Sequence, residues 1–125
     1  MSEHDHDHAH EEIQDCIDEC LNCHAACTMT VTHCLATGGT HNEINLVGVL
    51  LDCAEICQTS ANFMLRGSPY HIITCAACAE LCRACAEACR SVEDDEQMQH
   101  CAEVCEECAK HCEMMANAGE EEEDE

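Results

Sequence analysis

The clearest pattern in the chain lies between residues 75 and 89, in the segment CAACAELCRACAEAC. One residue type recurs there at alternating steps of three and four, the spacing that places side chains on one face of an α-helix. In most helical bundles Leu and Ile fill such a face, but here every position on it is a cysteine. The segment therefore predicts a helix with an inward row of thiols. These are Cys75, Cys78, Cys82, Cys85 and Cys89.

Three further segments carry the same spacing and predict three more helices. The first covers residues 11–37, and its inward face consists of Ile13, Cys16, Cys20, Cys23, Cys27, Val31 and Cys34. The second runs from Thr40 to about Arg66, and its inward face consists of Leu46, Leu50, Cys53, Cys57, Ser60 and Met64. The last runs to about residue 118, and its inward face consists of Met98, Cys101, Cys105, Cys108, Cys112 and Met115.

Turn and capping residues separate the first two predicted helices. Gly38 and Gly39 are expected to end the first helix, because glycine readily adopts the left-handed conformation found there. Thr40 followed by Glu43 has the spacing of a capping box and predicts the start of the second helix.

Similar signals separate the later helices. Ser68 and Pro69 suit the N-cap and first position of the helix over residues 69–91, which places His71 one turn before Cys75. Asp94 with Gln97 predicts the cap of the last helix.

Four helices of similar length with short connections predict an all-α fold, an antiparallel up-down-up-down four-helix bundle with a Cys-lined core. The bundle is expected over residues 11–118. Residues 1–10, which alternate His with acidic residues, predict a disordered His/Asp-rich arm that could also collect metal. Residues 119–125 predict a disordered acidic tail.

This topology gives the bundle two different ends. One end is expected to be an apolar plug, formed by Val31, Leu46, Leu50 and Met98. The opposite end, beside the His-rich arm, also carries Ile13 and Met114, and we expect it to be the mouth. The candidate metal ligands at this mouth are His71, His111, Met64 and Met115. His24, His33 and His100 each follow or precede a cysteine directly, and are expected on the flanks or surface of the bundle.

Composition and charge restrict the partners of such a bundle. The net charge is −23, from 27 acidic and four basic residues, which makes nucleic acid and anionic membranes poor partners. No run of 18 apolar residues predicts a membrane span. The N-terminus has none of the features of an export signal, so we expect a cytoplasmic protein with reduced thiols.

Two simple explanations for the sixteen cysteines are unsatisfactory. Residues one turn apart on a helix have Cβ atoms about 5–6 Å apart, whereas a disulfide needs about 3.5–4.5 Å. Core packing alone would favour Leu, whose burial contributes about 1.5–3 kcal/mol per side chain. The cysteines are therefore expected to serve through their sulfur.

Soft-metal binding is the remaining explanation, and Cu(I), Zn(II) and iron–sulfur clusters are the usual occupants of thiolate sites. The iron–sulfur spacing is missing, and zinc-finger pairs flank loops rather than lie along helices. Sixteen thiolates would lower the net charge to −39, and sixteen Cu(I) ions would restore −23. Since buried charge must be compensated, we expect many Cu(I) ions, about one per Cys, through bridging thiolates. General Zn or Cd buffering is the alternative.

An enzyme is not expected, because a catalytic thiol is usually one distinct cysteine beside a histidine or a helix N-terminus. Sixteen near-equivalent thiols do not fit that description.

The motifs CIDECLNCHAAC and CAACAELCRACAEAC, on four predicted helices, resemble the four-helix-bundle copper storage proteins, and in particular their cytosolic branch. The resemblance covers about residues 11–118. It implies Cu(I) storage by Cys thiolates inside the bundle, a homotetramer, and copper entering at one end near His and Met. Copper donor or acceptor proteins would then be partners. The chain departs from the densest pattern on its second helix, where only Cys53 and Cys57 are present.

Overall fold

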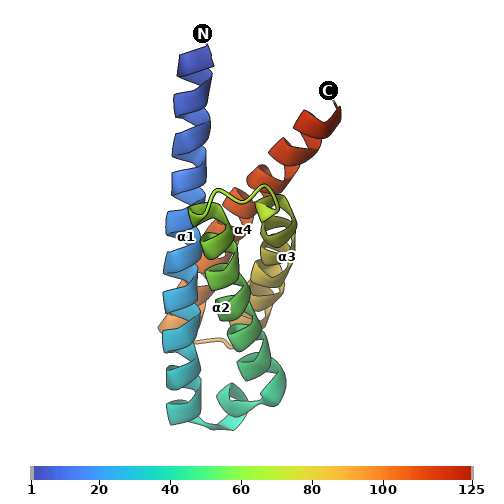
Figure 1. The fold of residues 1–125 in the computed structure, drawn as a ribbon. Helices are drawn as coiled ribbons and strands as arrows, with labels where there is room; N and C mark the ends of the chain where they lie inside the picture. Colours follow the sequence, from blue (N-terminus) through green and yellow to red (C-terminus); the bar gives the residue numbers. More distant parts are fainter. Residues whose placement is uncertain (1, 125) are drawn as a thin grey trace.

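The chain was analysed as a computed structural model, which describes residues 2–124, with side chains over residues 10–118. It contains four α-helices and one short 3-10 helix: α1 (Ser2–Thr37), η1 (Gly39–Asn42), α2 (Ile44–Leu65), α3 (His71–Arg90) and α4 (Glu96–Asp124). Both termini and the α2–α3 connection lie at one end of the bundle, and the other two connections lie at the opposite end (Figure 1). The predicted all-α up-down four-helix bundle is confirmed.

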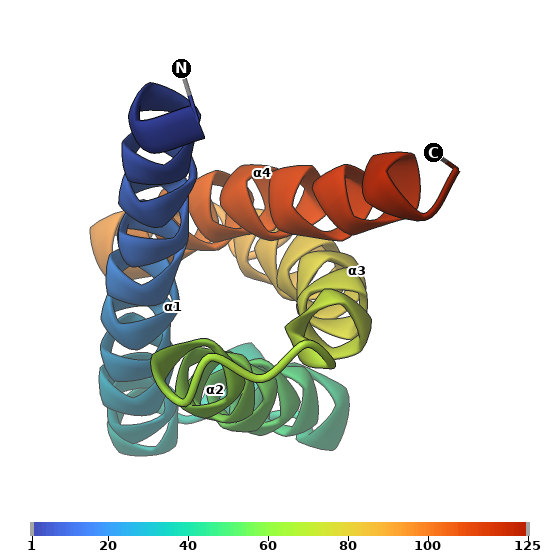
Figure 2. The ribbon, with the colours of Figure 1, turned by 45° about the horizontal axis from the view of Figure 1, so that its top comes forward.

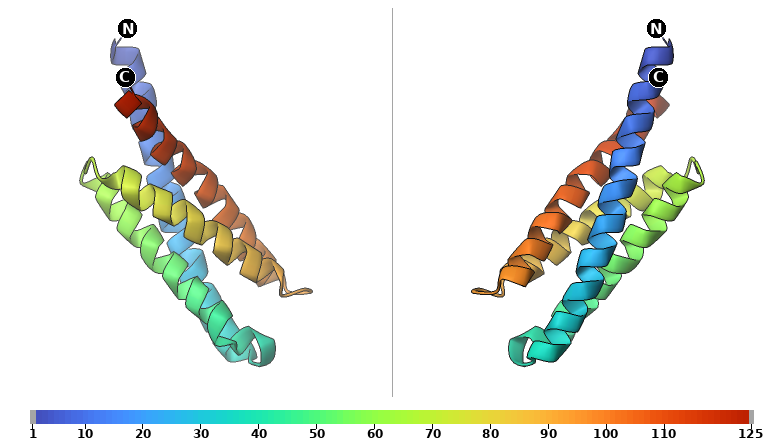
Figure 3. Two further views of the ribbon diagram at one scale, coloured as in Figure 1. Left: turned by 90° about the vertical axis from the view of Figure 1, so that its right-hand side faces the viewer. Right: turned by 90° about the vertical axis from the view of Figure 1, so that its left-hand side faces the viewer.

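The four helices are arranged around a common axis, as Figure 2 shows, and we call the interior into which their buried side chains point the lumen. Each helix contacts its two neighbours, α1 with α2 and α4, and α3 with α2 and α4. Within the described residues the backbones of the diagonal pairs do not approach one another. The side views in Figure 3 show α1 extending well beyond the α2–α3 connection. Side chains from four helices can therefore meet on one axis.

The residues that fill the lumen are small or sulfur-containing. Apart from the cysteines, the buried core contains alanines such as Ala61 and Ala102, which are fully buried and let neighbouring helices pack closely. Leu50 and Met98 are the largest fully buried side chains. The four helices are thus held around sulfur rather than around branched aliphatic side chains.

The start of α2 differs from the prediction. Gly38 and Gly39 have φ angles of 76° and 62°, which only glycine adopts without strain, and they lead the chain into η1. Thr40 lies inside η1, and Glu43 occupies the N-cap of α2 without a side-chain capping bond. The capping box expected at Thr40 and Glu43 was therefore wrong.

The start of α3 also differs, because the helix begins at His71 rather than at Pro69. The Ser68 hydroxyl accepts a hydrogen bond from the Tyr70 N–H at 3.1 Å, and the Ser68 carbonyl accepts one from the His71 N–H at 3.2 Å. Ser68 and Pro69 therefore form a turn that precedes the helix. At the other side of this turn Gly67, with φ 70°, ends α2.

The cap of α4 lies one residue beyond the predicted position. Asp95 Oδ1 accepts the Met98 N–H at 3.0 Å, the hydrogen bond that defines an N-cap. Asp94, the predicted cap, adopts φ 61° in the preceding turn. Asn and Asp tolerate this left-handed conformation better than most residues.

The outer ends of α1 and α4 extend into the segments predicted as a disordered arm and tail. No Gly or Pro lies in residues 2–10 to stop a helix, and acidic residues near a helix N-terminus favour its dipole. The side chains of residues 2–9 and 119–124 lie outside the described part of the structure. The domain division at residues 10 and 119 stays a prediction.

Among the helices that the structure describes, none combines the length and the apolar character needed to cross a lipid bilayer.

Candidate metal centre

All sixteen cysteines are free thiols with no exposed surface. Every predicted row places its cysteines in the buried core, so the inward orientation of the thiols is confirmed. No disulfide links any cysteine within the described residues. The lumen is therefore lined by free thiols along its length.

Thiols from different helices come into direct contact across the lumen. Cys20 and Cys112, from α1 and α4, have their sulfurs 3.5 Å apart, and the sulfurs of Cys57 and Cys78, from α2 and α3, lie 3.6 Å apart. Even the diagonal helices α1 and α3 are joined, because Cys23 Sγ lies 4.0 Å from Cys82 Sγ. The sulfur network thus spans all four helices.

Few of the sulfur contacts join two cysteines of the same helix. Cys23 and Cys27 lie 4.0 Å apart on α1, and Cys78 and Cys82 lie 3.8 Å apart on α3. The other sulfur contacts of 4.0 Å or less among the described residues join different helices, as Cys20 and Cys112 do. The natural unit of a metal site here is therefore a group of thiols from several helices.

Several groups of three or four thiols have all their sulfurs within 4.8 Å of one another. They include Cys20, Cys78, Cys108 and Cys112; Cys23, Cys53, Cys57 and Cys82; Cys23, Cys27, Cys53 and Cys105; Cys57, Cys78, Cys82 and Cys108; and Cys16, Cys75 and Cys112. A metal–sulfur bond of about 2.3 Å separates ligand sulfurs by about 3.8 Å in a tetrahedral site and about 4.0 Å in a trigonal one. The sulfur spacing already fits either geometry.

These groups overlap, and the overlap has a chemical consequence. Cys23 and Cys53 belong to two of the groups, and Cys78 and Cys108 to two others. If all the groups are to hold an ion at once, the shared thiolates must bridge two metals. For a soft monovalent ion such as Cu(I), sites that share bridging thiolates are more suitable than isolated sites of four thiolates.

Neighbouring thiols in the lumen share protons through hydrogen bonds, and these bonds shift the pKa values of the thiols. Burial opposes ionisation of every thiol, but hydrogen bonds between thiols favour it at some of them. Contacts with Cys108 and Cys112 lower the pKa of Cys20 to about 6. Contacts with Cys112 and Cys16 lower the pKa of Cys75 to about 3. The thiols that accept hydrogen bonds from their neighbours are therefore the ones that should lose a proton most readily to an incoming cation.

One end of the lumen, which we call the Met64 end, consists of Met64, His71, Cys75 and Met115. Met64 is almost fully buried, and its thioether sulfur lies 3.9 Å from Cys75 Sγ. Met115 is also buried and lies one turn beyond Cys112 on α4. Two of the predicted mouth residues thus place soft sulfur beside the first thiols.

The two predicted mouth histidines differ in their contacts. His71 is half-buried, and its Nδ1 donates to the Ser68 carbonyl at 2.8 Å, which leaves Nε2 with a lone pair. A histidine that donates one ring N–H to a backbone carbonyl is typical of metal ligands. His111 instead lies 3.9 Å from the half-exposed carboxylate of Glu107, on the outer side of α4.

The opposite end, which we call the Asp95 end, contains Leu46, Leu50, Met98 and the cluster around Asp95. The two leucines and Met98 are buried, as predicted, and Cys34 Sγ lies 3.7 Å from the Met98 sulfur. Val31 is only partly buried. Thr30 takes the core position instead and donates its hydroxyl to the Ala26 carbonyl at 2.7 Å.

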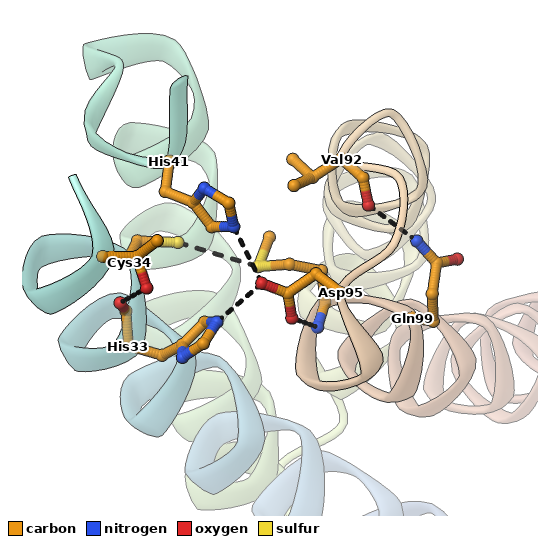
Figure 4. Close-up of polar contacts among 8 residues, drawn as sticks. His33, Cys34, His41, Val92, Asp95 and Gln99 are labelled. Carbon is orange, nitrogen blue, oxygen red and sulfur yellow. Dashed lines mark hydrogen bonds and ion pairs between the residues drawn. The ribbon is translucent and has the colours of Figure 1, made fainter. Parts of the chain in front are cut away.

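A polar cluster that the sequence did not reveal covers this end. His33 Nε2 and His41 Nε2 each lie 2.8 Å from Asp95 Oδ2 (Figure 4). The hydrogen bond from His33, together with those from Met98 N–H and His41, holds the pKa of Asp95 well below its usual range. The sequence could have indicated this cluster only through the predicted topology, because the end of α1, η1 and the start of α4 must meet at one end of an up-down bundle.

The remaining candidates lie off the thiol rows, as expected. His24 is half-buried on the outer side, where its Nδ1 donates to the Ala54 carbonyl at 2.8 Å. His100 is exposed. His33 also lies off the thiol row, but it has the partner described above.

A four-helix bundle whose interior holds sixteen thiols in overlapping groups is typical of proteins that bind soft metal ions in their interior. The sequence model of the copper storage protein family matches residues 3–117 of this chain. The chain belongs to this family.

Solved structures with the same fold support this assignment. A crystal structure of a Nitrosospira multiformis protein is 42% identical, with a TM-score of 0.82, and the match covers 86% of this chain and 97% of that one. The Cu(I)-bound copper storage protein BsCsp3 is 33% identical over 84% of this chain and 98% of its own, with a TM-score of 0.79. A cytosolic copper storage protein from Streptomyces lividans, studied during copper loading, is 31% identical over 86% of this chain and 93% of its own, with a TM-score of 0.77.

A Bacillus subtilis relative, described as the uncharacterized cysteine-rich protein YhjQ, is 35% identical over 66 residues. The match covers 53% of this chain and spans 61% of the length of that relative.

Proposed function

We propose that this protein stores Cu(I), bound by the thiolates of its sixteen cysteines inside the bundle. The observation that carries the proposal is the sulfur network, in which fully buried thiols from four helices lie within contact distance of one another. Membership of the copper storage family and the Cu(I)-bound state of BsCsp3 support the choice of metal. The ions are cargo, and no catalytic step is involved.

Charge supports a ratio of about one ion per cysteine. Each Cu(I) that binds a thiol releases one proton, so the buried interior gains no net charge. Zn(II) in an isolated tetrathiolate site would instead leave two negative charges in the lumen. Several of the four-thiol groups share cysteines, as Cys23 and Cys53 do, so those groups cannot all be isolated zinc sites at once.

Titration of the reduced protein with Cu(I) in the absence of oxygen tests this function. We expect saturation at roughly one Cu(I) per Cys, with bridging thiolates. Saturation at about four ions per chain, the number that sixteen thiols could supply to tetrahedral sites, would instead support general Zn or Cd buffering. Competition between Cu(I) and Zn(II) for the same sample separates the two functions directly.

A pair of substitutions on α2 provides a matched control for the titration. Cys57 and Ser60 are both fully buried and lie one turn apart. Cys57→Ser should lower the number of bound Cu(I) ions, whereas Ser60→Ala should leave it unchanged. Equal capacity in the two variants would contradict a role for the thiols as ligands.

Copper is proposed to enter at the Met64 end. The buried thioethers of Met64 and Met115, and His71 with its free Nε2, are soft or borderline ligands next to Cys75 and Cys112. His111 belongs to this mouth only if its ring turns away from Glu107. Donor or acceptor proteins would then dock around this end.

Two further features are proposed on the same basis. A homotetramer is supported by apolar side chains on the outer surface, among them Ile44, Tyr70 and Ile73 at 85%, 64% and 65% exposure. Sedimentation of the reduced protein should give the mass of four chains. A cytoplasmic location is supported by the cytosolic relative from Streptomyces lividans, and cell fractionation tests it.

A further inference from the structure

Three side chains from three separate elements converge on one oxygen atom at the Asp95 end. His33 comes from α1, His41 from η1, and Asp95 from the turn before α4. Each imidazole Nε2 lies 2.8 Å from Asp95 Oδ2, and the two rings meet edge to face with centroids 5.7 Å apart. Figure 4 shows both rings pointing at the same carboxylate oxygen.

The carboxylate is held in place from its other side. Asp95 Oδ1 accepts the Met98 N–H at 3.0 Å, so the backbone of α4 fixes its orientation and directs Oδ2 toward the histidines. Below it, Met98 and Cys34 are in contact through their sulfurs. The cluster is thus attached to the first turn of α4 through the hydrogen bond from Met98.

The cluster remains accessible from solvent. The side chains of His33, His41 and Asp95 are 29%, 15% and 15% exposed. A small cation could reach it without passing through the lumen. The large negative charge of the chain favours the approach of cations.

The donor set differs in kind from the sulfur of the lumen. Two imidazole nitrogens and one carboxylate oxygen are the ligands of many open zinc sites, in which water completes the coordination. Metal–ligand bonds of about 2.0–2.2 Å separate tetrahedral ligand atoms by about 3.4 Å. The nitrogen–oxygen distances here would need to open by about 0.6 Å, a change within the reach of side-chain rotation.

We propose that His33, His41 and Asp95 form a second metal site, outside the thiol lumen, for a borderline divalent cation such as Zn(II). The ion would take the place of the protons that the two imidazoles donate to Asp95 Oδ2. It would then join the end of α1, η1 and the start of α4, and would tighten the Asp95 end above Cys34 and Met98.

The two sites are expected to select different metals. Thiolates hold Cu(I) strongly, whereas imidazole and carboxylate ligands suit borderline divalent ions. Zn(II) added to thiols that are free would bind sulfur first. The second site is therefore best observed after the thiols have been filled with Cu(I).

The experiment uses the full chain, loaded with Cu(I) without oxygen and then exposed to Zn(II). Crystals are examined by anomalous scattering on both sides of the zinc edge, which distinguishes zinc from copper. We expect a zinc peak between His33 Nε2, His41 Nε2 and Asp95. A map with zinc only at other histidines, or with none, would overturn the proposal.

Solution binding gives a second readout with a matched control. The His33→Gln/His41→Gln variant keeps amides that can hydrogen-bond to Asp95 but loses both metal-binding nitrogens. It should bind about one zinc ion fewer per chain than the parent protein. His24→Gln alters another half-buried histidine, bonded to the Ala54 carbonyl, and should bind as much zinc as the parent.

An unchanged zinc count in the His33→Gln/His41→Gln variant would contradict the site, and so would an equal loss in His24→Gln. If the double variant does not fold, the anomalous map of the parent protein decides alone. Copper capacity is measured on the same samples. Because the site lies outside the lumen, Cu(I) capacity should be unchanged in the double variant even where zinc binding is lost.

Discussion

The two ends of the bundle use the same helices but present different chemistry to the thiols between them. At the Met64 end, the thioether of Met64 touches Cys75, and His71 lies one turn away on the same helix. At the Asp95 end, Leu46 and Leu50 are buried, and His33, His41 and Asp95 form an outer polar cluster.

This difference shows how one bundle can separate two kinds of ligand. At the Met64 end, the thioether sulfur of Met64 lies directly beside the Cys75 thiol, so a soft ion could move from one sulfur ligand to the next. At the Asp95 end, Met98 and Cys34 provide the last sulfurs, and the two buried leucines offer no lone pairs to a metal ion. The imidazoles and carboxylate of the outer cluster form a separate environment.

The apolar closure of the Asp95 end can be tested through stability. Leu50→Ala removes a large, fully buried side chain, and such changes cost about 2–5 kcal/mol in the free energy of unfolding. Denaturant unfolding of the reduced, metal-free protein measures this loss. We expect the largest effect of any single change discussed here.

The neighbouring residue provides the control for this measurement. Leu51 is 52% exposed, and changes at exposed positions are usually within about 0.5 kcal/mol. If Leu51→Ala destabilised the protein as much as Leu50→Ala, the closure at this end would not depend on the buried leucines.

The polar cover of the same end should have a smaller effect, and one that depends on pH. Asp95→Ala removes the N-cap of α4 and should cost about 0.5–2 kcal/mol at neutral pH. The folded state lowers the pKa of Asp95, so its ionised form is favoured by folding. The stabilisation is therefore present above the ordinary Asp pKa of about 3.9 and is lost as pH falls through the lower folded value.

Unfolding of the parent and Asp95→Ala proteins between neutral and acid pH measures this dependence. The stability difference should shrink as the pH falls below about 4. Glu93→Ala, at an exposed position in the same turn, should show no comparable change. A difference that grew in acid would mean that Asp95 does not stabilise the fold as a carboxylate.

Some of this architecture could be predicted from the sequence because it depends on helical periodicity. The thiol rows repeat at three and four residues, and the structure buries every cysteine as that repeat requires. Topology then follows from four helices with short connections. These predictions rest on a pattern repeated over many helical turns, so an error at one position does not change them.

Other features depend on single residues, and there the sequence was less informative. Val31 was predicted for the core from its spacing, but the structure buries Thr30 more fully, because its hydroxyl donates to the Ala26 carbonyl. The cluster around Asp95 was missed because its members are far apart along the chain and each resembles an ordinary surface residue. Only their meeting at one end gives them a common role.

The smallest expected effect concerns the route of copper into the lumen. His71 should offer its Nε2 to an arriving ion, since its Nδ1 already donates to the Ser68 carbonyl. If this ligand lowers the barrier to loading by about 1 kcal/mol, then His71→Ala should load Cu(I) roughly fivefold more slowly. Stopped-flow loading from a Cu(I) chelate, without oxygen, measures the rate.

The final copper content should not change, because His71→Ala leaves every cysteine in place. His24→Ala is the matched control, since His24 is also half-buried and also donates its Nδ1 to a carbonyl, but lies away from both ends. Slower loading in both variants would indicate a general effect on the fold. Normal loading in His71→Ala, with slower loading after changes at His33 and His41, would move the mouth to the Asp95 end and reverse the roles of the two ends.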